Sequence, residues 1–204
     1  MSVISRLTEQ FVRFPGIGPR QAKRFVYFLL TRDHRYLDEL SRLIQELKQQ
    51  VHHCAACFRF FTGRERDLCD ICSDKNRNQA LLMVVEKDVD FENIERSGVY
   101  DGLYLVLGGS VPVLEREPEK RVRSAALVDR VKQGSEAGML KEIIFALSAN
   151  TEGDNTERFL LPLVEPFREA HGVKISHLGR GLSTGTELEY SDSETIKNAL
   201  KNRS

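Results

Sequence analysis

The four cysteines of this chain restrict its fold more than any other feature of the sequence. They stand as Cys54-Ala-Ala-Cys57 and Cys69-Asp-Ile-Cys72, with eleven residues between the pairs and no further cysteine elsewhere. Each Cys-x-x-Cys turn aims two sulfurs at one point, so two turns supply the four thiolates of a closed tetrahedral zinc site. The spacing therefore predicts one structural Zn²⁺ per chain, with no open coordination position for catalysis.

Other uses of the four cysteines are alternatives. Two disulfides need an oxidising compartment, but the residues after Met1 lack the charged start, apolar core and cleavage site of a secretory signal. A redox dithiol explains one pair only, and an iron–sulfur cluster would use the same four ligands. If zinc is bound, Arg59, Arg64 and Arg66 are expected to offset part of the negative charge of the thiolates.

The positive charge of the chain is concentrated near its start. Over the whole sequence Lys and Arg balance Asp and Glu, but residues 1–35 carry a net charge of +5. Residues 36–100 sum to −3 and residues 101–204 to −2. A site for a polyanion is therefore expected in the first segment. No apolar run of about 18 residues is present, so a cytoplasmic protein without a membrane span is expected.

A glycine-rich turn, Phe14-Pro-Gly-Ile-Gly-Pro19, separates two amphipathic helical stretches within this basic segment. Its glycines let the backbone turn tightly, and a helix N-terminus with free N–H groups attracts anions. The turn resembles the helix-hairpin-helix motif of proteins that bind DNA without sequence specificity, and the alternative is an αα-hairpin with a solvated basic face. The residues expected to contact phosphates are Gly16, Gly18, Arg20, Lys23 and Arg24.

From Ala80 onward, short apolar runs alternate with helical patterns, which is typical of an α/β fold with a parallel sheet covered by helices. Pro162 and Pro166 are expected to delay, kink or break the third of these helices. Strands are predicted near residues 80–85, 102–107, 142–147 and 173–178. Helices are predicted near residues 90–97, 123–133, 156–170 and 193–200.

Acidic side chains follow the first of these strands. Glu86 ends the strand, where the ligand sites of open parallel sheets gather, and Asp88 and Asp90 come directly after it. Such carboxylates suit Mg²⁺. The alternative is that they cap the next helix, and capping is the favoured interpretation for Asp88.

Taken in order, these features resemble the bacterial recombination mediator family RecR along the full length of the chain. The supporting stretches are residues 14–24, the cysteine spacing, Val84-Val-Glu86, Asp90, Ile94-Glu95, residues 102–109, Glu152-Gly153, Arg180-Gly-Leu182 and Leu188-Glu-Tyr190. The resemblance implies a helical DNA-binding region at 1–52, a four-cysteine zinc finger at 53–76, a Toprim domain at 79–176 and a C-terminal segment at 177–204.

The resemblance implies a repair protein that is not an enzyme. It implies action with RecO and RecF in loading recombinase on gapped or single-stranded DNA, and self-assembly into dimers or a tetrameric ring. By the same resemblance, a negative patch of Glu86, Asp90 and Glu152 is expected to bind a partner, namely RecO.

Two stretches depart from the patterns that the resemblance predicts. Catalytic Toprim domains carry an Asp-x-Asp pair just before Glu-Gly, and Ser148 and Asn150 occupy those positions here. Neutral side chains hold a divalent cation poorly, so any Mg²⁺ at the carboxylates is expected to be weak. The loop at residues 110–118 is charged, unlike that of the family, which leaves its partner contacts open. The rival hypotheses are a Mg²⁺-dependent Toprim nuclease or primase-like enzyme, and a zinc-ribbon interaction module that never meets DNA.

Overall fold

The chain forms two compact units, residues 1–51 and residues 52–204. The structure is a computed structural model, and it describes residues 1–63, 67–179, 181–182, 185 and 187–201. None of the helices in these described ranges is long and apolar enough to cross a membrane.

The first unit is helical, as the apolar spacing predicts. The ring of Phe11 meets the rings of Phe14 and Phe25 edge-on, at centroid distances of 5.6 and 5.8 Å, and so joins the first two helices. Ala22 and Val26 are buried between the same helices, which supplies the apolar core of this small unit. The helices are α1 (Val3–Val12), α2 (Pro19–Leu30) and α3 (His34–Gln50).

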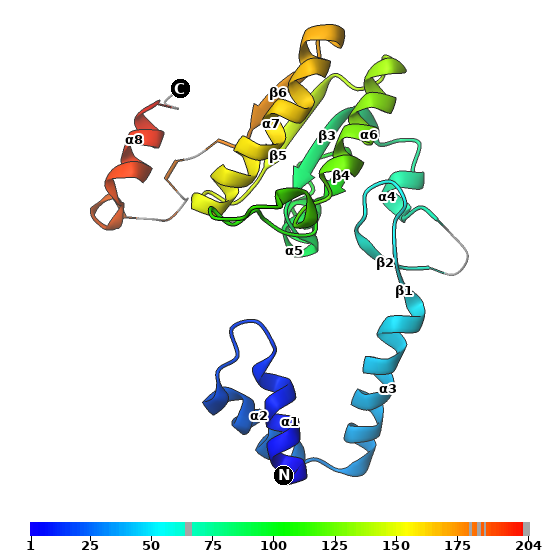
Figure 1. Ribbon diagram of the computed structural model, residues 1–204, viewed down its shortest axis with the longest axis vertical. Coiled ribbons are helices and arrows are strands. Elements are labelled where there is room, and N and C mark those ends of the chain that lie inside the picture. The colour runs from blue at the N-terminus through cyan, green and yellow to red at the C-terminus, as the bar shows by residue number, and fades with distance from the viewer. Residues whose placement is uncertain (64–66, 180, 183–184, 186, 202–204) are drawn as a thin grey trace. The chain divides into compact units, whose positions relative to one another are not determined.

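The second unit is built on a four-stranded sheet in which every pairing is parallel, with strand order β4-β3-β5-β6 (Figure 1). The central strand β3 ends level with both neighbours, since Val85 pairs with Val106 on one side and with Ala146 on the other. The predicted α/β class with a parallel sheet is therefore confirmed. The strands are β3 (Asn78–Val85), β4 (Gly102–Val106), β5 (Glu142–Ala146) and β6 (Lys174–His177).

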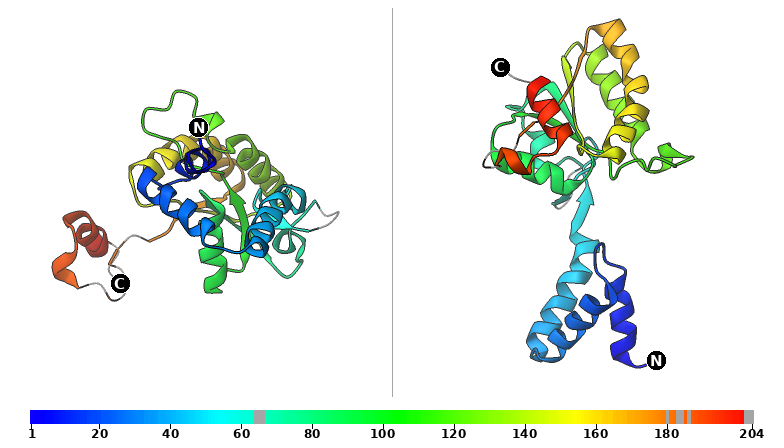
Figure 2. Two further views of the ribbon diagram at one scale, coloured as in Figure 1. Left: turned by 90° about the horizontal axis from the view of Figure 1, so that it is seen from below. Right: turned by 90° about the vertical axis from the view of Figure 1, so that its left-hand side faces the viewer.

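Each face of this sheet has its own cover. Because side chains alternate along a strand, Leu82 and Val84 of β3 face one core, and Met83 and Val85 face another. The first core is closed by α6 (Ser124–Glu136) and α7 (Thr151–His171), which lie side by side in the right-hand view of Figure 2. The second is closed by α5 (Asp88–Ser97) together with the cysteine segment.

The expectation that prolines disturb the third Toprim helix is wrong. α7 begins at Thr151, five residues earlier than predicted, and continues through Pro162 and Pro166 to His171. Pro166 lacks the N–H that would bond to the carbonyl of Pro162, but both prolines lie on the exposed face, where water can satisfy the freed carbonyls. Buried Leu160 and Val164 hold the opposite face in the core.

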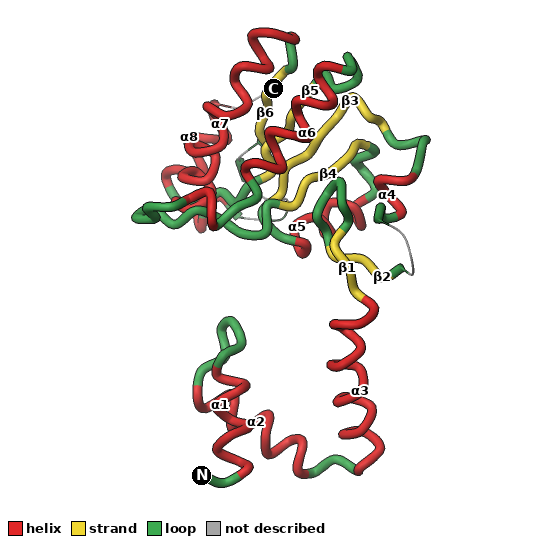
Figure 3. The backbone as a smooth tube through the Cα atoms, turned by 45° about the vertical axis from the view of Figure 1, so that its right-hand side comes forward, coloured by secondary structure: helices red, strands yellow, loops and turns green. Residues whose placement is uncertain are grey.

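Short elements complete the second unit (Figure 3). The cysteine segment forms a two-stranded sheet and one helical turn. The helix predicted near the C-terminus is present as α8. The remaining elements are β1 (Val51–His53), β2 (Phe60–Thr62), α4 (Asp70–Ser73), η1 (Pro118–Lys120), η2 (Leu188–Tyr190) and α8 (Ser193–Lys201).

Candidate functional site

The four cysteines converge on one point, as the spacing predicts. The sulfurs of Cys54, Cys57, Cys69 and Cys72 all lie within 4.8 Å of one another, and those of Cys57 and Cys69 are 3.6 Å apart. Four thiolates at the usual zinc–sulfur distance would stand about 3.8 Å apart. The cysteines are not joined by disulfides. The donor set and its spacing therefore fit a tetrahedral Zn²⁺ ion.

Backbone and side-chain donors around the cluster favour thiolates. The N–H of Cys69 donates to the sulfur of Cys54 at 3.4 Å, and the N–H of Cys72 donates to the sulfur of Cys69 at 3.5 Å. The pKa of the Cys69 thiol is lowered, first by its contact with the sulfur of Cys57 and also by the guanidinium of Arg59. Donors of this kind stabilise the deprotonated sulfur that a metal needs.

Arg59 lies where the sequence places a compensating charge. Its side chain is largely buried, forms an ion pair with Asp70 and stands over the ring of Phe91 at 4.9 Å. Its contact with Cys69 brings a positive charge next to the sulfurs. Arg64 and Arg66, which were expected to do the same, lie outside the described residues.

The cysteine segment is also part of the sheet's packing. Cys54, Cys57 and Cys69 share a buried cluster with residues of β3, β4 and α5. The N–H of Val106 in β4 donates to the carbonyl of Cys57 at 2.8 Å, which covers the open edge of that strand. An ion held by these cysteines would therefore stabilise one side of the Toprim sheet as well as its own segment.

The basic hairpin of the first unit has the geometry of an anion site. Gly16 adopts a φ of +73°, which glycine tolerates best, and Gly18 precedes α2 without any side-chain cap. The first N–H groups of α2 therefore have neither an intrahelical partner nor a capping side chain. A Cβ built on either glycine would meet no atom within 4 Å, so the turn is open to a ligand.

Three cations line the exposed face of α2. Arg20, Lys23 and Arg24 are exposed, while Ala22 and Val26 on the opposite face are buried. Within the described part of the chain, none of the three cations forms an ion pair. The face therefore keeps its positive charge for a partner outside the chain.

The carboxylate of Glu86 is used inside the protein. Only 3% of this residue is exposed, and its two oxygens accept hydrogen bonds from the backbone N–H and the hydroxyl of Ser148, at 2.8 and 2.9 Å. Ser148 follows β5, so the pair joins the carboxyl ends of neighbouring strands. A group with both oxygens engaged is not available to an ion or a partner in this conformation.

The other acidic residues of this edge also have internal partners. Asp90 accepts from the backbone N–H of Lys87 at 2.9 Å, and Glu152 accepts from the hydroxyl of Ser110 at 2.9 Å. Asp88 accepts from the backbone N–H of Phe60 at 2.7 Å. The interpretation of Asp88 as the helix cap is therefore wrong, because Asp90 caps α5 and Asp88 holds the zinc segment.

The three predicted carboxylates do not gather into a metal-binding group. Among the described residues, the four cysteines are the one cluster of three or more potential ligands. At the two positions of the missing aspartates, Ser148 bonds to Glu86, and Asn150 accepts from the N–H of Gly153 to cap α7. A Cβ on Gly153 would stand 1.9 Å from the carbonyl oxygen of Ser148, so the loop is closely packed.

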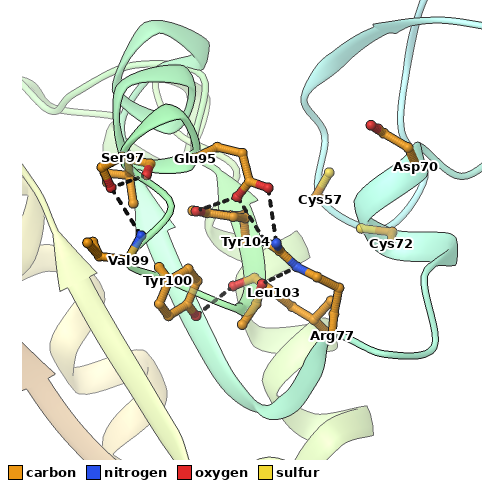
Figure 4. A network of polar contacts seen from close by, with 12 residues as sticks. Cys57, Asp70, Cys72, Arg77, Glu95, Ser97, Val99, Tyr100, Leu103 and Tyr104 are labelled. Carbon is orange, nitrogen blue, oxygen red and sulfur yellow. Dashed lines mark hydrogen bonds and ion pairs between the residues drawn. The ribbon is translucent and has the colours of Figure 1, made fainter.

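One polar network was not predicted from the sequence (Figure 4). Arg77 forms a bidentate ion pair with Glu95 at 2.9 and 3.0 Å, and Arg77 also donates to the carbonyl of Gly102 at 3.1 Å. The hydroxyl of Tyr104 donates to Glu95 at 2.9 Å, and burial raises the pKa of Tyr104. The partners are far apart in sequence, so the only available signal was Glu95 within a family-like stretch.

Comparisons with known proteins agree over the whole chain. Two family models described as "RecR, helix-hairpin-helix" and "RecR, C-terminal" match residues 4–48 and 181–204, and the Toprim domain model matches residues 80–179. The chain is 35% identical to the Recombination protein RecR of Bdellovibrio bacteriovorus over 205 residues, which is 100% of this chain and 97% of that protein.

Two further proteins of the same name are similar to a comparable extent. The Recombination protein RecR of Chloroflexus aggregans is 38% identical over 200 residues, covering 98% of this chain and 92% of its own length. That of Lactobacillus acidophilus is 32% identical over 200 residues, covering 98% of this chain and 96% of its own. With the helical hairpin, the cysteine cluster and the Toprim sheet in the same order, the chain belongs to the RecR family of recombination proteins.

Proposed function

We propose that this protein is a non-catalytic, DNA-binding scaffold of recombinational DNA repair. The observation that carries the proposal is the exposed face of α2, where Arg20, Lys23 and Arg24 have no carboxylate partners among the described residues. The names of the full-length relatives support the connection to recombination.

The proposed DNA contact is with the phosphate backbone. The uncapped N-terminus of α2 offers backbone donors, and the turn through Gly16 and Gly18 leaves room for a phosphodiester to approach them. The cations on the next two turns of the helix would neutralise neighbouring phosphates. Contacts of this kind carry no base sequence, so binding should be indifferent to sequence.

The proposal that the protein does no chemistry rests on the carboxyl edge of the sheet. Phosphoryl transfer with Mg²⁺ needs carboxylates placed around the ion, and Glu86 instead accepts two hydrogen bonds from Ser148. Asn150 is a neutral helix cap. Any Mg²⁺ that reaches Asp90 or Glu152 would be held weakly and without a paired ion.

The four-cysteine cluster is proposed to hold one structural Zn²⁺. When bound, the ion would supply folding energy, since four protein ligands leave no position for a substrate. The ligands would be Cys54, Cys57, Cys69 and Cys72, which the structure brings within reach of one another.

We further propose RecO and RecF as partners in loading recombinase on gapped DNA in the cytoplasm, and assembly into dimers or a tetrameric ring. The partner surface is proposed at Asp90 and Glu152, with Glu86 acting through the loop that it supports. This assignment follows the family resemblance and the exposure of Glu152, and Glu86 is 3% exposed, which limits it to an indirect role.

The direct test compares DNA binding by the protein and by an Arg20→Ala/Arg24→Ala variant. Fluorescence anisotropy with two gapped duplexes of unrelated sequence should show equal binding of both by the wild type and an equal, severalfold loss in the variant. The matched control is Arg96→Ala/Arg158→Ala, which removes two exposed cations of the second unit. Unchanged binding by the α2 variant would contradict the proposed contact.

The enzyme hypothesis is tested separately with plasmid DNA. The purified protein with Mg²⁺ is expected to leave supercoiled plasmid intact and to join no nucleotides. Nicking that is lost on Asp90→Ala/Glu152→Ala substitution would restore the nuclease hypothesis, because those carboxylates are the exposed acids of the edge.

A further inference from the structure

An apolar hollow of about 130 Å³ lies at the amino-terminal end of the sheet, away from the edge that carries Glu86. Leu81, Leu103, Met139 and Leu140 supply apolar lining, and half of the Met139 side chain is exposed. An engineered cavity of about 150 Å³ accommodates benzene, so this hollow has room for one branched aliphatic or aromatic side chain.

The strand that lines the hollow is irregular at this point. In the pairing of β3 with β4, Asn78 is level with Gly102, and the next aligned pair is Leu82 with Leu103. Residues 79–81 of β3 are therefore extra, and Gln79 and Leu81 from this bulge line the hollow. Bulges of this kind are frequent next to functional sites.

A second hollow of about 310 Å³ adjoins the first along α6. It lies between α6 and the cysteine segment, and it is lined by Ala55, Phe58 and Leu68 from the cysteine side. Arg130 and Gln133 line both hollows, so the two form one groove along a single stripe of the helix. The opposite side of α6 is buried in the core.

Arg130 stands at the junction without an acceptor. Among the described residues of the second unit, four arginines are half-buried. Arg59 is paired with Asp70, Arg77 with Glu95, and Arg123 donates to the carbonyl of Val106 at 2.9 Å. Within the same described residues, Arg130 has no ion pair or side-chain hydrogen bond. A half-buried guanidinium without an acceptor is costly, and a carboxylate ligand would remove that cost.

We propose that this groove binds an acidic peptide segment of a partner protein. A large apolar side chain of the segment fills the hollow between Leu103 and Met139, and a carboxylate next to it pairs with Arg130. Gln133 offers an amide to the peptide backbone. This surface is distinct from the basic face of α2 and from the carboxyl edge of the sheet, so its occupation does not depend on the proposed function.

The test uses the full chain labelled with ¹³C at its methionine methyl groups. The sequence has three methionines, and Met83 is 5% exposed in the opposite core, so Met1 and Met83 are internal controls for Met139. The probe is a synthetic peptide, acetyl-Gly-Glu-Leu-Phe-Glu-Gly-amide. The Met139 signal is expected to shift saturably, with a Kd on the order of 1 mM, and the other two signals are expected to stay in place.

The variants identify the cause of any shift. Arg130→Gln should weaken binding about tenfold, the loss expected for one charge-assisted hydrogen bond, while Lys132→Gln on the exposed side of the same helix should leave it unchanged. Met139→Gln, followed by anisotropy of a labelled peptide, should weaken binding as well. An unchanged Met83 signal in each variant shows that the fold is kept.

Three results would overturn the proposal. The first is the lack of a saturable Met139 shift up to about 10 mM peptide, a concentration well above the expected Kd. The second is equal binding of a control peptide with Lys in place of Glu, or with Ser-Ser in place of Leu-Phe. The third is a Met139 signal that moves on dilution of the protein alone, which would make a second copy of the chain the occupant.

Discussion

Replacing Glu86 with alanine is predicted to destabilise the second unit. The buried carboxylate holds the residues after β5 through the N–H and the hydroxyl of Ser148, at 2.8 and 2.9 Å. A hydrogen bond to a charged acceptor contributes about 1.5 to 3 kcal/mol, and removal of the buried charge returns part of that loss. The free energy of unfolding should therefore fall by about 3 kcal/mol.

Companion variants separate the contributions. Ser148→Ala keeps the backbone bond and loses the hydroxyl bond, so it should cost about 1.5 kcal/mol. Asp90→Ala removes an exposed helix cap and should cost about 1 kcal/mol. The assay is urea unfolding at saturating zinc, followed by far-UV circular dichroism. If Glu86→Ala unfolds within about 0.5 kcal/mol of the wild type, the internal role of this carboxylate is refuted.

Three further predictions concern the metal, a buried ion pair and acid. Cys57→Ser should lower zinc content below one ion per chain and loosen the sheet edge at Val106, and elemental analysis that finds iron at a comparable level would contradict the zinc assignment. Arg77→Met should cost about 2 kcal/mol because Glu95 loses its bidentate partner, whereas Arg77→Met/Glu95→Leu should recover part of that in urea unfolding. Hydrogen bonds from Ser176 and then Lys174 lower the pKa of Glu142, so its stabilisation is present above the ordinary carboxyl pKa and is lost as pH falls through the lowered value. Glu142→Gln should flatten this acid limb of a stability–pH profile.

The sequence was sufficient for features that depend on local pattern. Continuous apolar runs such as 80–85 predicted buried parallel strands, because both faces of each strand are covered by helices or by the cysteine segment. The two Cys-x-x-Cys turns predicted the cluster because each turn places its own two sulfurs. The exposed face of α2 followed from the 3.6-residue period, with Ala22 and Val26 on its buried side.

Features that depend on tertiary contacts were not predictable in this way. Glu86 and Ser148 are 62 residues apart, and nothing in the local pattern distinguishes a strand-end carboxylate that binds a ligand from one that holds a loop. Asp88 has the position of a helix cap, but the N–H of Phe60 reaches it from the cysteine segment. The two prolines of α7 are tolerated because both fall on the exposed face, which depends on how the helix packs.

The salt dependence of DNA binding tests the central claim most directly. Each phosphate contact contributes about 0.9 to the slope of log K against log salt, so Arg20→Ala/Arg24→Ala should reduce the slope by about 1.8. The control variant Arg96→Ala/Arg158→Ala, with the same change in net charge, should keep the wild-type slope. An α2 variant that keeps the wild-type slope, with the control losing it, would place the DNA contact on the second unit and contradict the account.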